Sequence, residues 1–288
     1  MLKITSLCLI SLLAFGAMAQ ITTPAGSPSG SVSSTVGLTE VSIDYYRPKV
    51  KGRQIFGLGD QYLLQNGIMW RTGANSGTRL TVSTPAKIGG VEVPAGTYLI
   101  ITTPGEDQFE FMLYSDASIG SDFSKIVEEK IKVVLKTNVI KSTEITETLT
   151  FQISDISADN TSANIHFQWS NISWKVPIEV NFDKLVMEQI AINTQVNPAN
   201  YMAAANYYLE TGKDLNQALE WAKSYLSIEA NQNQYWNYHS LAKIQAALGM
   251  KKDAITNAEI SLEAAKKGFG DAAYIKRNEN LIEELKGK

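Results

Sequence analysis

The spacing of hydrophobic residues changes once along the chain, near residue 182. Before that point, apolar and polar residues alternate in short segments bounded by turn residues, which is typical of half-buried β-strands. In segment 39–46, for example, Val41, Ile43 and Tyr45 fall on one face of a strand, and the residues between them are polar. After residue 182 the apolar positions take the spacing of helices. The pattern therefore predicts an all-β domain followed by an all-α domain.

Turn signals divide the first domain into many short strands. Gly89-Gly90 lies between two short apolar segments and predicts a tight hairpin, because both central residues of a type I′ turn need positive φ. Residues 122–129 are expected to form a short helix or a loop. Regularly spaced strands with few helices between them favour an antiparallel β-sandwich. Besides 39–46 and the hairpin at 87–92, strands are predicted at 98–103, 108–115, 130–137, 145–153, 163–169 and 172–180.

The second domain contains a 36-residue repeat. Ala218-Leu-Glu-Trp-Ala222 recurs as Ala254-Ile-Thr-Asn-Ala258, and each follows a glycine, Gly212 or Gly249, of the kind that ends a helix. This resembles a pair of tetratricopeptide repeats, in which small residues let paired helices pack closely. The small and apolar positions of that motif are held by Ala218, Ala222, Leu241, Ala242, Ala254 and Ala258.

Capping residues and flanking segments extend this helical module. Asn197 before Pro198 has the pattern of an N-cap followed by a proline at the first helical position. Asp214 with Gln217 resembles a capping box. Because two repeats are fewer than such stacks need, further helices are expected near residues 185–193 and 272–285.

The N-terminus has the features of a secretory signal peptide. Lys3 precedes an apolar run from 4 to 15, and Ala17-Met-Ala19 forms a cleavage site before Gln20. The apolar run is too short to span a bilayer. We therefore expect a signal peptide at 1–19, a β-sandwich domain at 20–182 (ordered from about residue 27) and an α-helical tetratricopeptide-like domain at 183–288. The protein is expected to be exported to the periplasm or the medium, with no transmembrane segment.

Composition excludes several classes of chemistry. Cleavage would remove Cys8, the single cysteine, and leave 25 cations against 29 anions, a balance unlike the basic surface that nucleic acid requires. The two histidines, His166 and His239, are far apart and lack the short ligand spacing of common zinc sites. His166 alternates with Ile165 and Phe167 and is interpreted as a solvent-facing strand residue. No cofactor, metal or nucleic-acid partner is expected.

A row of cations is the first candidate site. Within 47–53 the cations occupy alternate positions, so an extended backbone would place them on one face. They could grip an anionic ligand, such as a carboxylate-bearing glycan or a phosphate. Alternatively, Pro48 and Gly52 shape a loop whose charges are solvated or paired with Asp44 and Asp60. The row consists of Arg47, Lys49, Lys51 and Arg53.

The segment Trp70-Arg-Thr-Gly-Ala-Asn75 is the second candidate. Trp70 could stack on a sugar ring while Arg71 and Asn75 bond its hydroxyl groups. The alternative is a buried Trp70 in the sandwich, with Arg71 and Asn75 satisfying loop carbonyls. We predict that six residues of the two segments converge as one polar patch: Arg47, Lys51, Arg53, Trp70, Arg71 and Asn75.

These two segments, with Gly37 and Pro94-Ala-Gly-Thr-Tyr98, resemble a secreted bacterial family, domain-of-unknown-function family 2911. The resemblance covers most of the first 180 residues and implies no particular activity. The leading hypothesis is therefore a non-catalytic exported binding or scaffold protein that engages a protein partner through its helical repeats. The alternative is a carbohydrate-binding or carbohydrate-processing β-sandwich. Carboxylates on the predicted strands could form a hydrolytic pair, but most are interpreted as solvent-facing residues.

Overall fold

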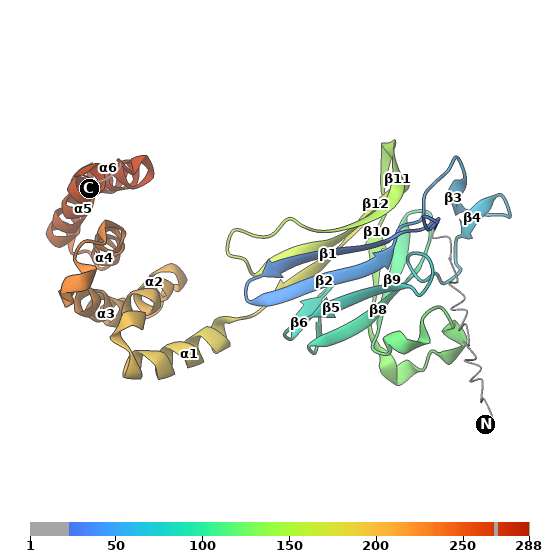
Figure 1. The fold of residues 1–288 in the computed structure, drawn as a ribbon, viewed down its shortest axis with the longest axis horizontal. Helices are drawn as coiled ribbons and strands as arrows, with labels where there is room; N and C mark the ends of the chain where they lie inside the picture. The colour runs from blue at the N-terminus through green and yellow to red at the C-terminus, as the bar shows by residue number, and fades with distance from the viewer. Residues whose placement is uncertain (1–22, 268–269, 288) are drawn as a thin grey trace, which may run out of the picture. The chain divides into compact units, whose positions relative to one another are not determined.

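The structure is a computed structural model of the 288-residue chain and describes residues 23–267 and 270–287. The chain divides after Asn181 into two compact units, the first rich in strands and the second helical (Figure 1). The predicted two-domain organisation, antiparallel β followed by all-α, is confirmed. The expected signal peptide lies outside the described residues. Each unit is presented by itself.

The larger sheet of the β-unit has the strand order β1-β2-β5-β8-β9-β10. Every neighbouring pair in it is antiparallel, as the alternating pattern predicted. Its strands are β1 (Ser29–Val36), β2 (Thr39–Tyr46), β5 (Thr78–Val82), β8 (Gly96–Thr103), β9 (Gln108–Tyr114) and β10 (Ile131–Asn138).

The second sheet has the order β11-β12-β6-β7, also antiparallel. The predicted hairpin is present between β6 and β7, where Gly89 and Gly90 have φ of 58° and 83°. A short parallel pair, β3-β4, was not predicted from the sequence. The bounds are β11 (Ile140–Ser154), β12 (Ser162–Val180), β6 (Ala86–Ile88), β7 (Val91–Val93), β3 (Gln54–Gly57) and β4 (Tyr62–Gln65).

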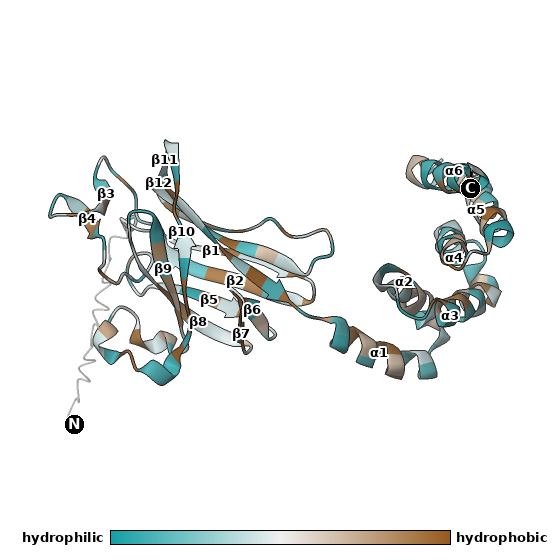
Figure 2. Ribbon diagram, turned by 180° about the vertical axis from the view of Figure 1, so that it is seen from behind, coloured by the Kyte–Doolittle hydropathy of each residue, from teal (hydrophilic) through white to brown (hydrophobic). Residues whose placement is uncertain are grey.

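Aromatic side chains fill the space between the two sheets. Phe111 on β9 lies edge-on to Trp174 on β12, with ring centroids 5.8 Å apart, and Phe167 stacks on Trp174 at 4.8 Å. Tyr45 on β2 meets Phe151 on β11 at 5.1 Å. These contacts join residues of opposite sheets, so the β-unit is a sandwich with one aromatic core. Figure 2 shows the hydrophobic stretches along its strands.

β12 corrects one expectation, because the strands predicted at 163–169 and 172–180 form a single strand of 19 residues. The buried positions are odd-numbered up to Trp169 and even-numbered from Trp174 onward. Ser170, with φ of 58°, lies where this phase changes, and the register with β11 shifts on both sides of it. The irregularity therefore keeps both halves of a long strand facing the same core.

Between β9 and β10 the chain forms short 3-10 turns, where a short helix or loop was expected. These turns are η1 (Ala117–Ile119), η2 (Phe123–Lys125) and η3 (Glu128–Lys130). The buried Tyr114 anchors them, since its hydroxyl donates to the Lys125 carbonyl and accepts from the Val127 N–H, both at 3.2 Å. The segment is thereby held over β8 and β9, where its apolar side chains pack on Leu99 and Ile101.

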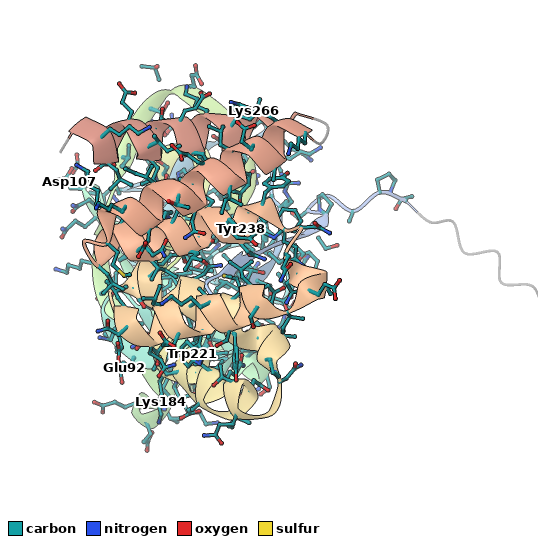
Figure 3. The ribbon with its side chains drawn as sticks, turned by 90° about the vertical axis from the view of Figure 1, so that its left-hand side faces the viewer. Glu92, Asp107, Lys184, Trp221, Tyr238 and Lys266 are labelled. Carbon is teal, nitrogen blue, oxygen red and sulfur yellow. The ribbon has the colours of Figure 1, made fainter. Side chains whose placement is uncertain are left out.

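The described part of the second unit folds into six α-helices, which fit the expected tetratricopeptide-like stack. Neighbouring helices pack in sequence order, α2 with α3, α4 with α5, and α5 with α6. Trp221 and Tyr238, labelled in Figure 3, pack against the apolar core that α2, α3 and α4 form. The helices are α1 (Asp183–Val196), α2 (Tyr201–Thr211), α3 (Leu215–Ser227), α4 (Tyr235–Ala247), α5 (Lys251–Lys267) and α6 (Ala272–Gly287).

The predicted helix ends are confirmed. Gly212 ends α2 in the left-handed conformation, with φ of 64°, and Gly249 after α4 has φ of 75°. Asp214 caps α3 by accepting the N–H groups of residues 216 and 217. Asn197 caps a 3-10 turn, η4 (Pro198–Asn200), that leads into α2. Trp236 on α4 is 42% exposed and so lies outside the repeat core.

Candidate functional site

The backbone of residues 48–50 pairs with β11, and residues 51–53 form an exposed turn beside it. The Pro48 carbonyl accepts the Leu149 N–H at 2.9 Å, and the Val50 N–H donates to the Glu147 carbonyl at 2.8 Å. These bonds extend the second sheet by one short segment. The row of cations is therefore held on the edge of a strand almost 100 residues further along the chain.

Both arginines of this row use their side chains to bind the protein itself. Arg47 donates from Nε to the Leu149 carbonyl and from Nη2 to Thr150 Oγ1, both at 3.3 Å. Arg53 donates to the carbonyls of Val50 at 3.1 Å and Lys49 at 2.5 Å. In the described part of the chain, no ion pair joins this row to Asp44 or Asp60, the partners that the sequence suggested.

Lys49, Lys51 and Arg53 are the exposed cations of the row, and Arg47 is half-buried. Lys51 has φ of 50°, and its backbone N–H donates to the Glu147 carboxylate at 3.0 Å. Gly52 follows with φ of 69°, so the tight turn is shaped by these two residues. The charge facing solvent is therefore smaller than the alternating sequence implied, because Glu147 lies beside the lysines.

Trp70 belongs to the aromatic core. It is 7% exposed, stacks on Trp169 with ring centroids 5.8 Å apart, and lies edge-on to Phe56 and Phe167. Its indole N–H donates to the Gly73 carbonyl at 3.0 Å. Since the ring is covered on its faces and its N–H is bonded, Trp70 has the architectural role that the sequence offered as the alternative to sugar stacking.

The loop after Trp70 is held by buried threonines. The Thr72 hydroxyl bonds that of Thr102 at 3.0 Å, and Thr78 Oγ1 donates to the Thr72 carbonyl at 2.7 Å. Asn75 is exposed, with φ of 54°. Arg71 is half-buried, and its Nε has no hydrogen-bond partner among the described residues. Among the described residues no carboxylate forms an ion pair with Arg71.

The two candidate segments meet at one point, but their side chains have different partners. Gly73 packs so closely on the residue before Arg47 that a Cβ there would lie 3.2 Å from the Tyr46 carbonyl oxygen. Arg47 and Arg53, however, bond toward β11, Trp70 enters the core and Asn75 is exposed. The predicted convergence of six polar side chains is therefore wrong for Trp70. Ligand binding by the other five stays a prediction.

The helical unit contains a polar groove that the sequence analysis did not identify. Residues of α2, α4 and α6 line this groove, which has a volume of about 560 Å³. It carries cations, carboxylates, amides and a histidine, so it can both donate and accept hydrogen bonds. We call it the inner groove; its polar lining includes Asn206, Glu210, His239, Lys243, Arg277 and Asn280.

A buried network orients His239 in the inner groove. Asn278 is fully buried and donates through Nδ2 to Ser261 Oγ at 2.9 Å and to the Tyr274 carbonyl at 2.8 Å. Its Oδ1 is therefore the acceptor for His239 Nδ1, 2.7 Å away. This bond places the proton of the neutral ring on Nδ1 and leaves Nε2 as a hydrogen-bond acceptor.

Burial lowers the pKa of His239 below its ordinary value of 6.5, and the nearby cations Lys243 and Arg277 act in the same direction. The hydrogen bond to Asn278 opposes them. The ring is consequently neutral at neutral pH. Arg277 in turn lies over the ring of Tyr274, 4.9 Å from its centroid. Helical spacing of polar residues on α4 and α6 is the sequence signal that could have revealed this surface.

The strongly shifted carboxylates belong to exposed turns of the sandwich. Hydrogen bonds from Lys130 and Ser118 lower the pKa of Asp116 to about 2, and bonds from Ser157 and Thr161 do the same for Asp159. Each carboxylate fixes a turn. No group of three or more potential metal ligands occurs in residues 23–267 and 270–287, and no helix in those ranges is long and apolar enough to cross a membrane.

An antiparallel sandwich with an aromatic core, followed by packed helices that line a polar groove, defines a two-unit protein with a β-sandwich and a helical unit. The chain belongs to the family described as "Protein of unknown function (DUF2911)", whose model matches residues 27–178. The match confirms the resemblance noted in the sequence and covers the sandwich. No curated protein and no solved structure matches the chain.

Proposed function

We propose that this protein is an exported, non-catalytic binding protein whose helical unit holds a segment of a partner protein in the inner groove. The observation that carries the proposal is the groove itself, about 560 Å³ in volume and lined by three helices. Its size lies within the range of ordinary ligand-binding pockets.

The lining is chemically suited to a peptide. A peptide backbone offers both N–H donors and carbonyl acceptors, and the amides of Asn206 and Asn280 can pair with either. Lys243 and Arg277 add donors for carbonyl or carboxylate oxygens, while neutral His239 adds an acceptor. Because Asn278 fixes His239 before any partner arrives, ordering of this ring would cost little side-chain entropy on binding.

Affinity capture tests this proposal. The full chain is immobilised and exposed to envelope extract, beside the double variant Lys243→Glu with Arg277→Glu. Retention of one defined protein by the wild type, and its loss in the variant, is expected. The matched control is Lys251→Glu with Lys252→Glu, which changes the charge equally on exposed residues outside the inner groove. Equal retention by all three proteins would reject the groove as the binding surface.

Export is part of the same proposal and is supported by the pattern of residues 1–19. N-terminal sequencing of the protein recovered from the envelope or medium should begin at Gln20. Recovery of an uncleaved chain from the cytoplasmic fraction would contradict it.

The carbohydrate alternative rests on the sandwich. Because Trp70 lies in the core, the six residues predicted to bind a ligand include no accessible aromatic ring. Sugar recognition would therefore depend on Lys51, Arg71 and Asn75. A glycan array with the full chain separates the two functions. Specific glycan retention that is lost in Asn75→Ala, but kept in the Lys243 and Arg277 double variant, would favour the alternative.

A further inference from the structure

A second groove lies between the last two helices, on residues distinct from those of the inner groove. It has a volume of about 770 Å³ and is bordered by α5 and α6. Leu262 and Ile282 supply its apolar surface, and both are half-buried. We call it the outer groove; the carboxylates along it are Glu259, Glu263, Glu279 and Glu283.

The charges of the outer groove are strongly unbalanced. Against four carboxylates stands one lysine of the lining, Lys286, whose Nζ lies 3.4 Å from Glu259 Oε1. Glu263 is paired at 3.5 Å with Lys266, which lies outside the lining. For Glu279 and Glu283 the described residues provide no ion pair. The groove therefore retains negative charge beside an apolar surface.

The spacing of these carboxylates is unfavourable for the isolated helices. Glu259 and Glu263 are four residues apart on α5, as are Glu279 and Glu283 on α6, and like charges at this spacing repel one another. On α5 the repulsion is reduced by Lys286 and Lys266, which pair with Glu259 and Glu263. On α6 it is left for the cations of a partner to reduce.

We infer that the outer groove binds an amphipathic helix with a basic face. The apolar stripe of such a helix would cover Leu262 and Ile282, and lysines or arginines beside the stripe would meet the glutamates of α5 and α6. Helix α1 of a second copy fits poorly, since it carries Asp183, Lys184 and Glu188 and is therefore net negative. This inference goes beyond the proposed function, because it concerns a different surface and a partner of stated charge.

Binding of a model peptide tests the inference directly. The probe is a fluorescein-labelled amphipathic helix of leucine and lysine, titrated with the full chain by fluorescence anisotropy. The expected result is saturable binding that weakens at least tenfold in Glu279→Lys with Glu283→Lys, and that weakens as salt is added. The control Glu220→Lys with Glu229→Lys has the same charge change on exposed residues of α3 and the following turn, and should change affinity less than twofold.

Further variants test whether the apolar surface contributes to peptide binding beyond the charges. Ile282→Asn should weaken binding about tenfold, whereas Ile260→Asn, at an isoleucine 44% exposed on α5 and outside the lining, should not. Circular dichroism confirms that each variant is folded. Lys243→Glu with Arg277→Glu should bind the peptide as the wild type does, which separates this groove from the inner one. Equal binding by all charge variants, or equal binding of a leucine–glutamate peptide, would overturn the inference.

Discussion

Trp70 shows how one residue type can serve two purposes that a sequence does not distinguish. The residues around it are compatible with stacking on a sugar ring and with burial in the core. The outcome depends on contacts with residues such as Trp169, which lies about 100 positions further along the chain. The stacking distance of 5.8 Å and the bonded indole N–H give Trp70 the core role.

Replacing Trp70 by alanine should therefore destabilise the sandwich by about 3–5 kcal/mol, the usual range for removing a large buried aromatic side chain. Urea unfolding of the full chain, followed through the transition of the sandwich, gives this free energy of unfolding. Ile145→Ala is the control, since Ile145 is 58% exposed and its loss should change stability by no more than about 0.5 kcal/mol. A loss below about 1 kcal/mol for Trp70→Ala would show that the ring is not part of the core.

His239 makes the stability of the helical unit depend on pH. Its pKa in the folded unit lies below the ordinary value of 6.5, so the unfolded chain binds the proton more readily. The stabilisation is fully present above pH 6.5 and is lost as the pH falls through the lower, folded value. We expect the melting temperature of this unit to fall between pH 7 and pH 5.

His239→Gln should flatten this pH dependence, because the amide can donate to Asn278 without titrating. His166→Gln is the control, since His166 also has a lowered pKa but belongs to the sandwich. Thermal melts followed at 222 nm report the helical transition. An unchanged pH dependence in His239→Gln would contradict the assignment.

At the scale of elements, local signals predicted the helix ends well and the long strands less well. Gly212 and Asp214 act through bonds within one or two turns, which sequence alone can indicate. The single long β12 and the parallel pair β3-β4 depend on contacts between distant segments. Phe56, for example, connects β3 to the core through Phe109 and Trp169, at 5.3 and 5.8 Å.

The irregularity in β12 has a measurable consequence. Ser170 has φ of 58°, a conformation that glycine adopts without steric cost. Ser170→Gly should raise the free energy of unfolding of the sandwich by about 1 kcal/mol, and Ser170→Val should lower it. Ser173→Gly, three residues further along and without positive φ, should be destabilising by about 0.5–1 kcal/mol. If glycine has the same effect at both positions, the backbone at residue 170 is not strained.

The candidate site was predicted less completely than the fold, for a physical reason. Arg47 donates hydrogen bonds to Leu149 and Thr150, more than 100 residues away. A sequence does not reveal which distant oxygen atoms will accept hydrogen bonds from an arginine. The inner groove was also not predicted, because its lining residues come from three helices that are brought together only by folding. By contrast, the alternating apolar residues of the strands and the 36-residue repeat of the helices are periodic patterns that can be seen in the sequence itself.

At the scale of the molecule, the division after Asn181 predicts that each unit folds by itself. Fragments 23–181 and 182–288, expressed separately, should give β-type and helical circular dichroism spectra respectively. Each should also unfold cooperatively, because each has its own buried core. A helical spectrum from the first fragment, or an unfolded second fragment, would contradict this organisation.

Photo-crosslinking from the inner groove tests directly whether a partner protein binds there. A photoreactive amino acid at Asn280, which lines that groove, is compared with one at Lys252, an exposed residue outside it. In cells that produce the full chain, we expect one defined protein adduct from position 280, none from 252, and loss of the adduct in Lys243→Glu with Arg277→Glu. Adducts of equal yield from both positions, or none from 280 while a probe at Lys51 is captured, would contradict this expectation.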